Sequence, residues 1–72
     1  MIDYNTINVG DKVYYHPPYK SIDMIENGIV KEIPTHTTTE VRVVFHCDND
    51  WDNYSQYTSA LTPVKDLYLG WL

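Results

Sequence analysis

Short runs in which apolar and polar residues alternate, with turn-forming residues between them, constrain this chain most. The clearest run occupies residues 41–47, where Phe45 and Cys47 face one side and His46 faces the other. A period of two residues is that of a strand with one buried face. Comparable runs lie within residues 9–16, 28–33, 58–61 and 67–69. We therefore predict an all-β fold.

Turn signals between these runs predict where the chain reverses. Asn27-Gly28 is a pair typical of tight hairpin turns. Within the next run, Val30 and Ile33 are three residues apart, which predicts a bulge or a strong bend in that strand. Ser21 is suited to cap one helical turn, but the segment that follows is too short for a stable helix. We expect at most one helical turn in the chain.

The chain has 72 residues, which is the size of one domain, so residues 1–72 are treated as a single unit. A chain of this length has a thin core, and self-association is one common remedy. Its one cysteine, Cys47, excludes a disulfide within the chain, and we expect a homo-oligomer. About five short antiparallel strands of this kind are best protected when the sheet curls into a small barrel.

The formal net charge is −5, and the five Lys and Arg residues are scattered singly along the sequence. Direct binding to duplex nucleic acid depends on clustered cations, so we do not expect it. No apolar run approaches the ~20 residues of a membrane helix, and the N-terminus does not read as a signal peptide. We expect no membrane contact and a cytoplasmic location.

Three motifs occur in an order found in a known group of folds: Val-Gly-Asp-Lys-Val-Tyr-Tyr at 9–15, Asn-Gly-Ile-Val-Lys-Glu-Ile at 27–33, and Val-Arg-Val-Val-Phe-His-Cys at 41–47. With Val-Lys-Asp-Leu at 64–67, they resemble SH3-like barrels of the Tudor, chromo-barrel and KOW type. The resemblance implies an SH3-like antiparallel barrel. The chain also resembles small accessory proteins of bacteriophages and prophages, which implies the bacterial host cytoplasm.

Residues 45–57 combine large aromatic side chains with carboxylates just after the clearest strand. Tudor-type domains hold methylated side chains in aromatic cages, and the resemblance implies such a cage from Tyr15, Trp51, Tyr54 and Tyr57. The alternative is that these aromatics pack in the core of a very small domain. The predicted binding residues are Tyr15, His46, Asp50, Trp51, Asp52, Asn53, Tyr54 and Tyr57.

Catalytic and metal-binding patterns are missing from the sequence. The carboxylates around Asp50 lack the glycine and the distal glutamate of a calcium-binding loop. His46 and Cys47 are neighbours on a strand and point to opposite faces, so they cannot converge on one ion or substrate. No nucleophile–base order or phosphate-binding glycine loop is present. We predict that the protein is not an enzyme and has no metal site or cofactor.

Three functions stay open on the sequence alone. The leading one is a phage accessory or anti-defence protein that inhibits or sequesters a host protein through the aromatic and acidic loop. The second is an oligomeric sponge that captures a nucleotide signalling molecule by stacking on Trp51 or Tyr57, with Asp52 and Asn53 at the base edge. The third is a Tudor-like reader of methylated side chains.

Overall fold

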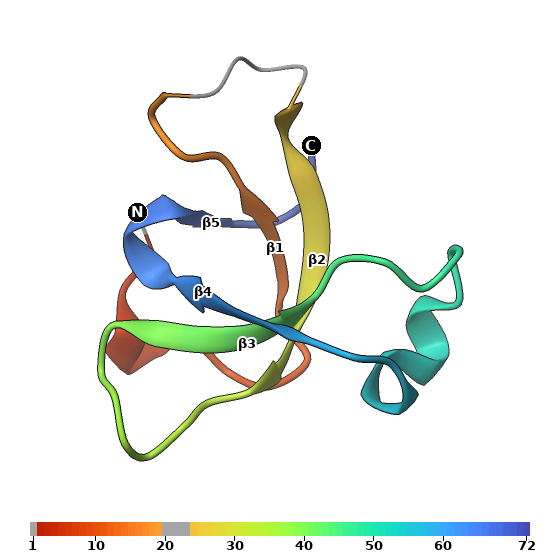
Figure 1. Cartoon of the computed structure of the whole chain (residues 1–72), viewed down its shortest axis with the longest axis horizontal. Helices are drawn as coiled ribbons and strands as arrows, with labels where there is room; N and C mark the ends of the chain where they lie inside the picture. Colours follow the sequence, from red (N-terminus) through yellow and green to blue (C-terminus); the bar gives the residue numbers. More distant parts are fainter. Residues whose placement is uncertain (1, 20–23) are drawn as a thin grey trace.

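One antiparallel sheet makes up most of the computed structural model, which describes residues 2–19 and 24–72 (Figure 1). Its strands are β1 (Lys12–Tyr15), β2 (Glu26–Glu32), β3 (Glu40–Val44), β4 (Ala60–Pro63) and β5 (Leu67–Leu69). The five strands pair in the order β4-β3-β2-β1-β5, and every neighbouring pair is antiparallel. The predicted all-β class with about five short strands is confirmed.

The strand pairing does not close the sheet into a barrel, because β4 and β5 stand at its two edges. The sheet is nevertheless strongly curled. Tyr15 on β1 and Leu61 on β4 line the same groove, although β2 and β3 lie between their strands in the pairing order. Figure 1 shows β4 crossing in front of the strands from the middle of the sheet.

Short 3-10 turns precede the first strand and connect later ones, and the described residues contain more of them than the sequence predicted. The described residues contain η1 (Tyr4–Thr6), η3 (Trp51–Gln56) and η4 (Val64–Asp66), so the expectation of at most one helical turn was wrong. Turns of three to six residues are too short to show a helical periodicity in the sequence. The helical turn predicted after Ser21 begins outside the described residues. Among the described residues, no helix combines the length and the apolar character that a membrane span requires.

A β-bulge in β2 confirms the irregularity that the sequence predicted. Val30 pairs with Val43 and Glu32 pairs with Arg42, so Lys31 is the extra residue on β2. Because of this extra residue, two consecutive side chains, Lys31 and Glu32, point away from the core. Val30 before the bulge is fully buried, and Ile33 after it points inward again and packs against the core.

The third strand is shorter than predicted: β3 ends at Val44 and does not continue to Cys47. Its ladder with β4 stops where Val43 meets Ala60, because the chain then leaves the sheet to form the long loop of residues 45–59. The predicted directions survive this correction. Cys47 is buried with 2% exposure, whereas His46 is exposed.

Apolar side chains are buried on both faces of the sheet. The main core lies on the concave face and consists of Ile2, Ile7, Val13, Val30, Val41, Val43, Val64 and Leu67. Ile29 and Val44 are cross-strand partners that are buried outside this cluster. On this second face, η3 packs against β2 and covers part of the sheet.

Candidate functional site

The loop between β3 and β4 starts with a tight turn. Asp48 and Asn49 both have left-handed φ angles, 52° and 66°, and the N–H of Asp50 donates to the carbonyl oxygen of Cys47 at 2.8 Å. Asp and Asn tolerate this backbone region better than other residues with a side chain. The turn predicted at these residues is confirmed, and it leads the chain into η3.

The Asp50 carboxylate ties the two ends of η3 together. Its Oδ1 accepts a hydrogen bond from Asn53 Nδ2 at 2.9 Å, and its Oδ2 accepts one from the Tyr57 hydroxyl at 2.7 Å. Hydrogen bonds to an ionised acceptor are stronger than those between neutral groups. Three of the predicted binding residues are therefore joined to one another within the loop.

The hydrogen bond to Asp50 is the main cause of a raised pKa at Tyr57, since the phenol must keep its proton to donate. Desolvation of the charged phenolate form by burial and the negative charge of Asp50 raise this pKa in the same direction. At neutral pH the phenol therefore stays protonated and holds the end of η3.

Trp51 packs against a second tryptophan from the end of the chain. Its ring centroid lies 4.8 Å from that of Trp71, with the two planes 54° apart. The Trp71 indole N–H donates to the carbonyl oxygen of Gly28 at 2.8 Å, and Lys12 Nζ lies 4.7 Å from the centre of the Trp71 ring. This group connects η3, β1, β2 and the chain end on the outer face of the sheet.

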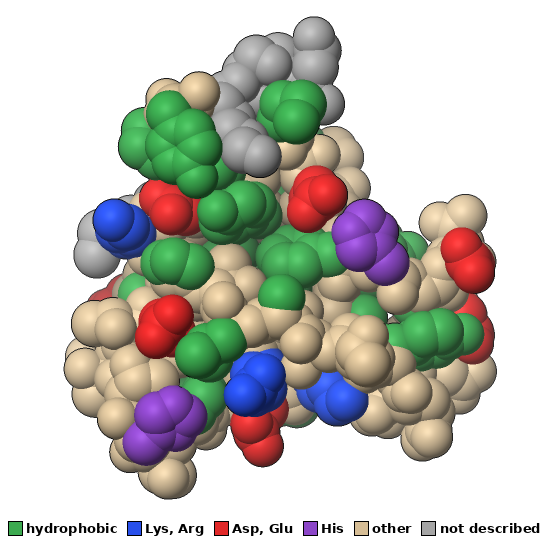
Figure 2. All heavy atoms as spheres, viewed as in Figure 1, with side chains coloured by type: hydrophobic (Ala, Val, Ile, Leu, Met, Phe, Trp, Pro, Cys, Tyr) green, Lys and Arg blue, Asp and Glu red, His purple; other side chains and the backbone are tan. Residues whose placement is uncertain are grey.

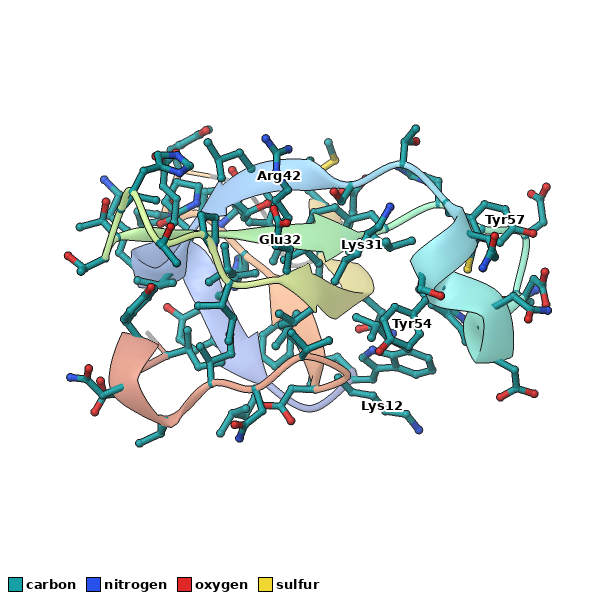
Figure 3. The ribbon with its side chains drawn as sticks, turned by 90° about the horizontal axis from the view of Figure 1, so that it is seen from below. Lys12, Lys31, Glu32, Arg42, Tyr54 and Tyr57 are labelled. Carbon is teal, nitrogen blue, oxygen red and sulfur yellow. The ribbon has the colours of Figure 1, made fainter. Side chains whose placement is uncertain are left out.

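Tyr54 and Tyr57 also have partners on the body of the domain. A Cβ atom added at Gly10 would lie 3.5 Å from the Tyr54 hydroxyl, so that phenol sits beside the backbone of the turn before β1. Lys31 Nζ donates to the carbonyl oxygen of Tyr57 at 2.6 Å. Figure 3 shows Tyr54 and Tyr57 at the end of the molecule that η3 occupies, with Lys31 on the neighbouring strand β2.

Trp51 and Tyr54 in η3 and Tyr57 directly after it are half-buried, and only Asp52 and Asn53 among the predicted loop residues are exposed. These contacts are what the core-packing alternative predicts. Binding by Trp51, Tyr54 or Tyr57 stays a prediction, with less aromatic surface available to a partner than an open rim loop would offer.

Tyr15 and His46, the two other predicted residues, lie together at a different place. They line a groove of about 320 Å³, which we call the aromatic groove, with Phe45, Glu26 and residues 60–63 of β4. The Tyr15 and Phe45 ring centroids are 5.9 Å apart, with the planes at 57°. Figure 2 shows hydrophobic side chains gathered across the middle of this face, with carboxylates among them.

Negative groups surround the aromatic floor of this groove. Burial raises the pKa of the Tyr15 phenol, and Tyr19 adds to the shift through its charge and a hydrogen bond. The carboxylates of Asp66 and Glu26 raise it further. Glu26 also lies 3.7 Å from His46 Nε2 at the rim, and both side chains are well exposed. The groove therefore presents neutral aromatic rings beside accessible negative charge.

The fold thus divides the predicted binding residues into an η3 group and a groove group. The sequence did not indicate Glu26, Phe45 or Leu61 as partners of Tyr15, because 30 residues or more separate Tyr15 from the last two. Trp71 was missed as the partner of Trp51 because it too is distant in the sequence and lies outside the predicted strands. The sequence contained two indirect signals of these contacts, namely the inward direction assigned to Phe45 and the aromatic side chain of Trp71.

Among the described residues, no three His, Cys, Asp or Glu side chains gather closely enough to hold a metal ion. Cys47 is a buried free thiol. Comparisons with protein-family models, with curated proteins and with solved structures found no match to this chain.

Proposed function

We propose that this chain is a non-enzymatic binding module, built on a small SH3-like barrel, that recognises a cationic segment of a partner protein. The observation that carries the proposal is the aromatic groove, in which Tyr15 and Phe45 form the floor and Glu26 stands at the rim. A cationic side chain is attracted both by an aromatic face and by a carboxylate.

The barrel assignment is supported by the strand arrangement. The order β4-β3-β2-β1-β5 brings the last strand beside the first, and η4 forms a single 3-10 turn between β4 and β5. The curl that places β1 and β4 around one groove favours the same assignment. The aromatic groove lies where β1 and β3 end, because Tyr15 is the last residue of β1 and Phe45 directly follows β3.

Charge complementarity supports a basic partner over an acidic one. The chain carries a net charge of −5, and the carboxylates near Tyr15 are those of Glu26 and Asp66. A cation over an exposed aromatic ring gains about 0.5–1 kcal/mol, and more when it loses water. Two rings and a carboxylate together give a modest affinity, which suits a reversible binding module.

A methylated lysine or arginine is the refinement of this proposal that the groove favours. Methylation preserves the charge and enlarges the apolar surface in contact with Tyr15 and Phe45. Inhibition of a host defence protein, phage origin and capture of a nucleotide signal stay predictions of the sequence.

The test is a titration of the ¹⁵N-labelled protein with a short peptide of alternating glycine and arginine, followed by NMR. We expect shifts at Tyr15, Glu26, Phe45 and Leu61. In Glu26→Gln the exposed carboxylate is lost, and because such pairs contribute about 0.5–1 kcal/mol, affinity should fall about two- to fivefold. Lysine and trimethyl-lysine versions of the peptide report the effect of methylation.

Glu32→Gln is the matched control, because it removes the same charge from an exposed carboxylate on the other face of the sheet. It should leave peptide affinity unchanged. Equal binding of a glycine–glutamate peptide, or shifts confined to η3, would overturn the assignment of the groove. Thermal melts of both variants establish that they fold like the parent protein.

A further inference from the structure

Cations that are scattered in the sequence come together on the outer face of the sheet. Lys31 lies on β2 at the bulge, and Arg42 lies on β3 opposite Glu32. The bulge places both Lys31 and Glu32 outward, so three charged side chains share this surface. Figure 3 shows Glu32 and Arg42 beside one another, with Lys31 on the side nearer η3.

These side chains line a cavity of about 430 Å³, which we call the basic pocket. Its wall is formed by Lys31, Glu32, Arg42, Thr58 and Ser59. Residues 58–59 also line a smaller cavity beside Phe45 and His46. The aromatic groove is a separate cavity, which is lined by residues 60–63 and by Glu26 but by none of the residues of the basic pocket.

The pocket keeps hydrogen-bond donors available. Lys31 Nζ donates one bond, to the Tyr57 carbonyl oxygen at 2.6 Å, and an ammonium group has three donors. Arg42 contacts Glu32 through Nε at 3.3 Å. Its terminal guanidinium N–H groups are then the donors that can bind a ligand. Within the described residues, the hydroxyls of Thr58 and Ser59 make no hydrogen bond to another group.

We propose that the basic pocket binds a phosphate group, free or carried by a small molecule. Two cations and two hydroxyls surround a space large enough for a small phosphorylated ligand. Guanidinium groups match the geometry of phosphate oxygens, and ammonium groups add a compact positive charge. A polyanion such as duplex DNA is not favoured, because only two cations line the site.

Glu32 is the competitor that the ligand displaces. Its side chain is 61% exposed and pairs with Arg42, which is itself 40% exposed. A phosphate group that takes over Arg42 frees Glu32 to turn into solvent, and the like charge of that carboxylate opposes binding. Removing the charge of Glu32 should therefore strengthen phosphate binding. If the Arg42–Glu32 pair were only a surface ion pair beside no ligand site, this substitution would have no such effect.

The test is a calorimetric and NMR titration with inorganic phosphate, glucose 6-phosphate and adenosine monophosphate at low ionic strength. We expect shifts at Lys31, Arg42, Thr58 and Ser59. Arg42→Gln removes a charge-assisted hydrogen bond and should weaken binding about tenfold or more. Glu32→Gln should strengthen it about threefold, as loss of an exposed like charge predicts. The three probes distinguish free phosphate from a phosphorylated small molecule.

Glu26→Gln and Lys65→Gln are the controls, because each removes one charge outside the basic pocket. Each control variant should change phosphate affinity only slightly, through its small effect on the electrostatic potential of the whole protein. If Glu32→Gln binds phosphate no better than the parent protein, or if Lys65→Gln weakens binding as much as Arg42→Gln, the site is refuted. Glu26→Gln and Glu32→Gln exchange roles between the two experiments: each is the test variant at its own site and the control at the other site. The two proposals therefore fail independently.

Discussion

At the scale of single residues, Gly28 belongs to a sequence pair that is typical of a turn, but the structure requires the glycine for another reason. Asn27-Gly28 predicted a turn, but both residues lie inside β2. The Asn27 side chain instead exchanges two hydrogen bonds with the backbone of Leu72. A Cβ atom at Gly28 would lie 2.6 Å from Val43 Cγ1 and 2.8 Å from the Val44 carbonyl oxygen. The glycine is needed for close packing against β3.

Gly28→Ala should therefore be costly. The added methyl group meets backbone and buried side chains, and overpacking of this kind lowers the free energy of unfolding by about 1–3 kcal/mol. Urea denaturation followed by tryptophan fluorescence measures the change. Gly70→Ala is the control: its φ is 89°, but no atom lies within 4 Å of the added Cβ. Its cost is backbone strain alone, about 1–2 kcal/mol. A Gly28→Ala variant as stable as the parent protein would contradict the close packing.

At the scale of elements, η3 explains the aromatic spacing that drew attention in the sequence. Trp51, Tyr54 and Tyr57 are three residues apart, which is the repeat of a 3-10 helix. Of these, only Trp51 and Tyr54 lie in η3, which is kinked at Asn53, and Tyr57 is the extended residue that follows it. All three aromatics are half-buried against the body of the domain. The same spacing is therefore also typical of a short 3-10 segment whose aromatic side chains pack against the domain.

A double-mutant cycle tests the link between η3 and the chain end. Trp51→Ala and Trp71→Ala should each lower the free energy of unfolding by about 2 kcal/mol, roughly half the cost for a fully buried tryptophan. Because the rings contact one another, the double variant should lose less than the sum of the two, by about 0.5–1.5 kcal/mol. Denaturation in urea gives all four values. Strict additivity would show that the two rings do not stabilise each other.

At the scale of the whole molecule, the fold sorts charges that look evenly mixed in the sequence. The sequence contains ten Asp and Glu residues and five Lys and Arg residues. Among the described residues, the ion pairs are Arg42–Glu32 and His46–Glu26, and both are exposed. Most of the described carboxylates thus have no cation within ion-pair distance, so repulsion among carboxylates opposes the compact state.

Sodium chloride should therefore stabilise the protein. Raising its concentration from about 0.01 M to 0.5 M shortens the screening length several-fold, and Tm should rise by about 2–4 °C. Differential scanning fluorimetry measures the shift. Glu26→Gln, which has one negative charge fewer, should show a smaller rise. A fall in Tm with salt would mean that the two ion pairs outweigh the repulsion.

The sequence by itself determined the strand class, the bulge in β2, the turn at residues 48–50 and the opposite directions of His46 and Cys47. These features depend on a period of two and on turn chemistry, which are properties of neighbouring residues. Only the tertiary structure decided which side chains meet. Tyr15 reaches Phe45, Trp51 reaches Trp71, and Lys31 shares a pocket with Arg42, because the curl of the sheet, the bulge and the course of the chain end bring distant residues together.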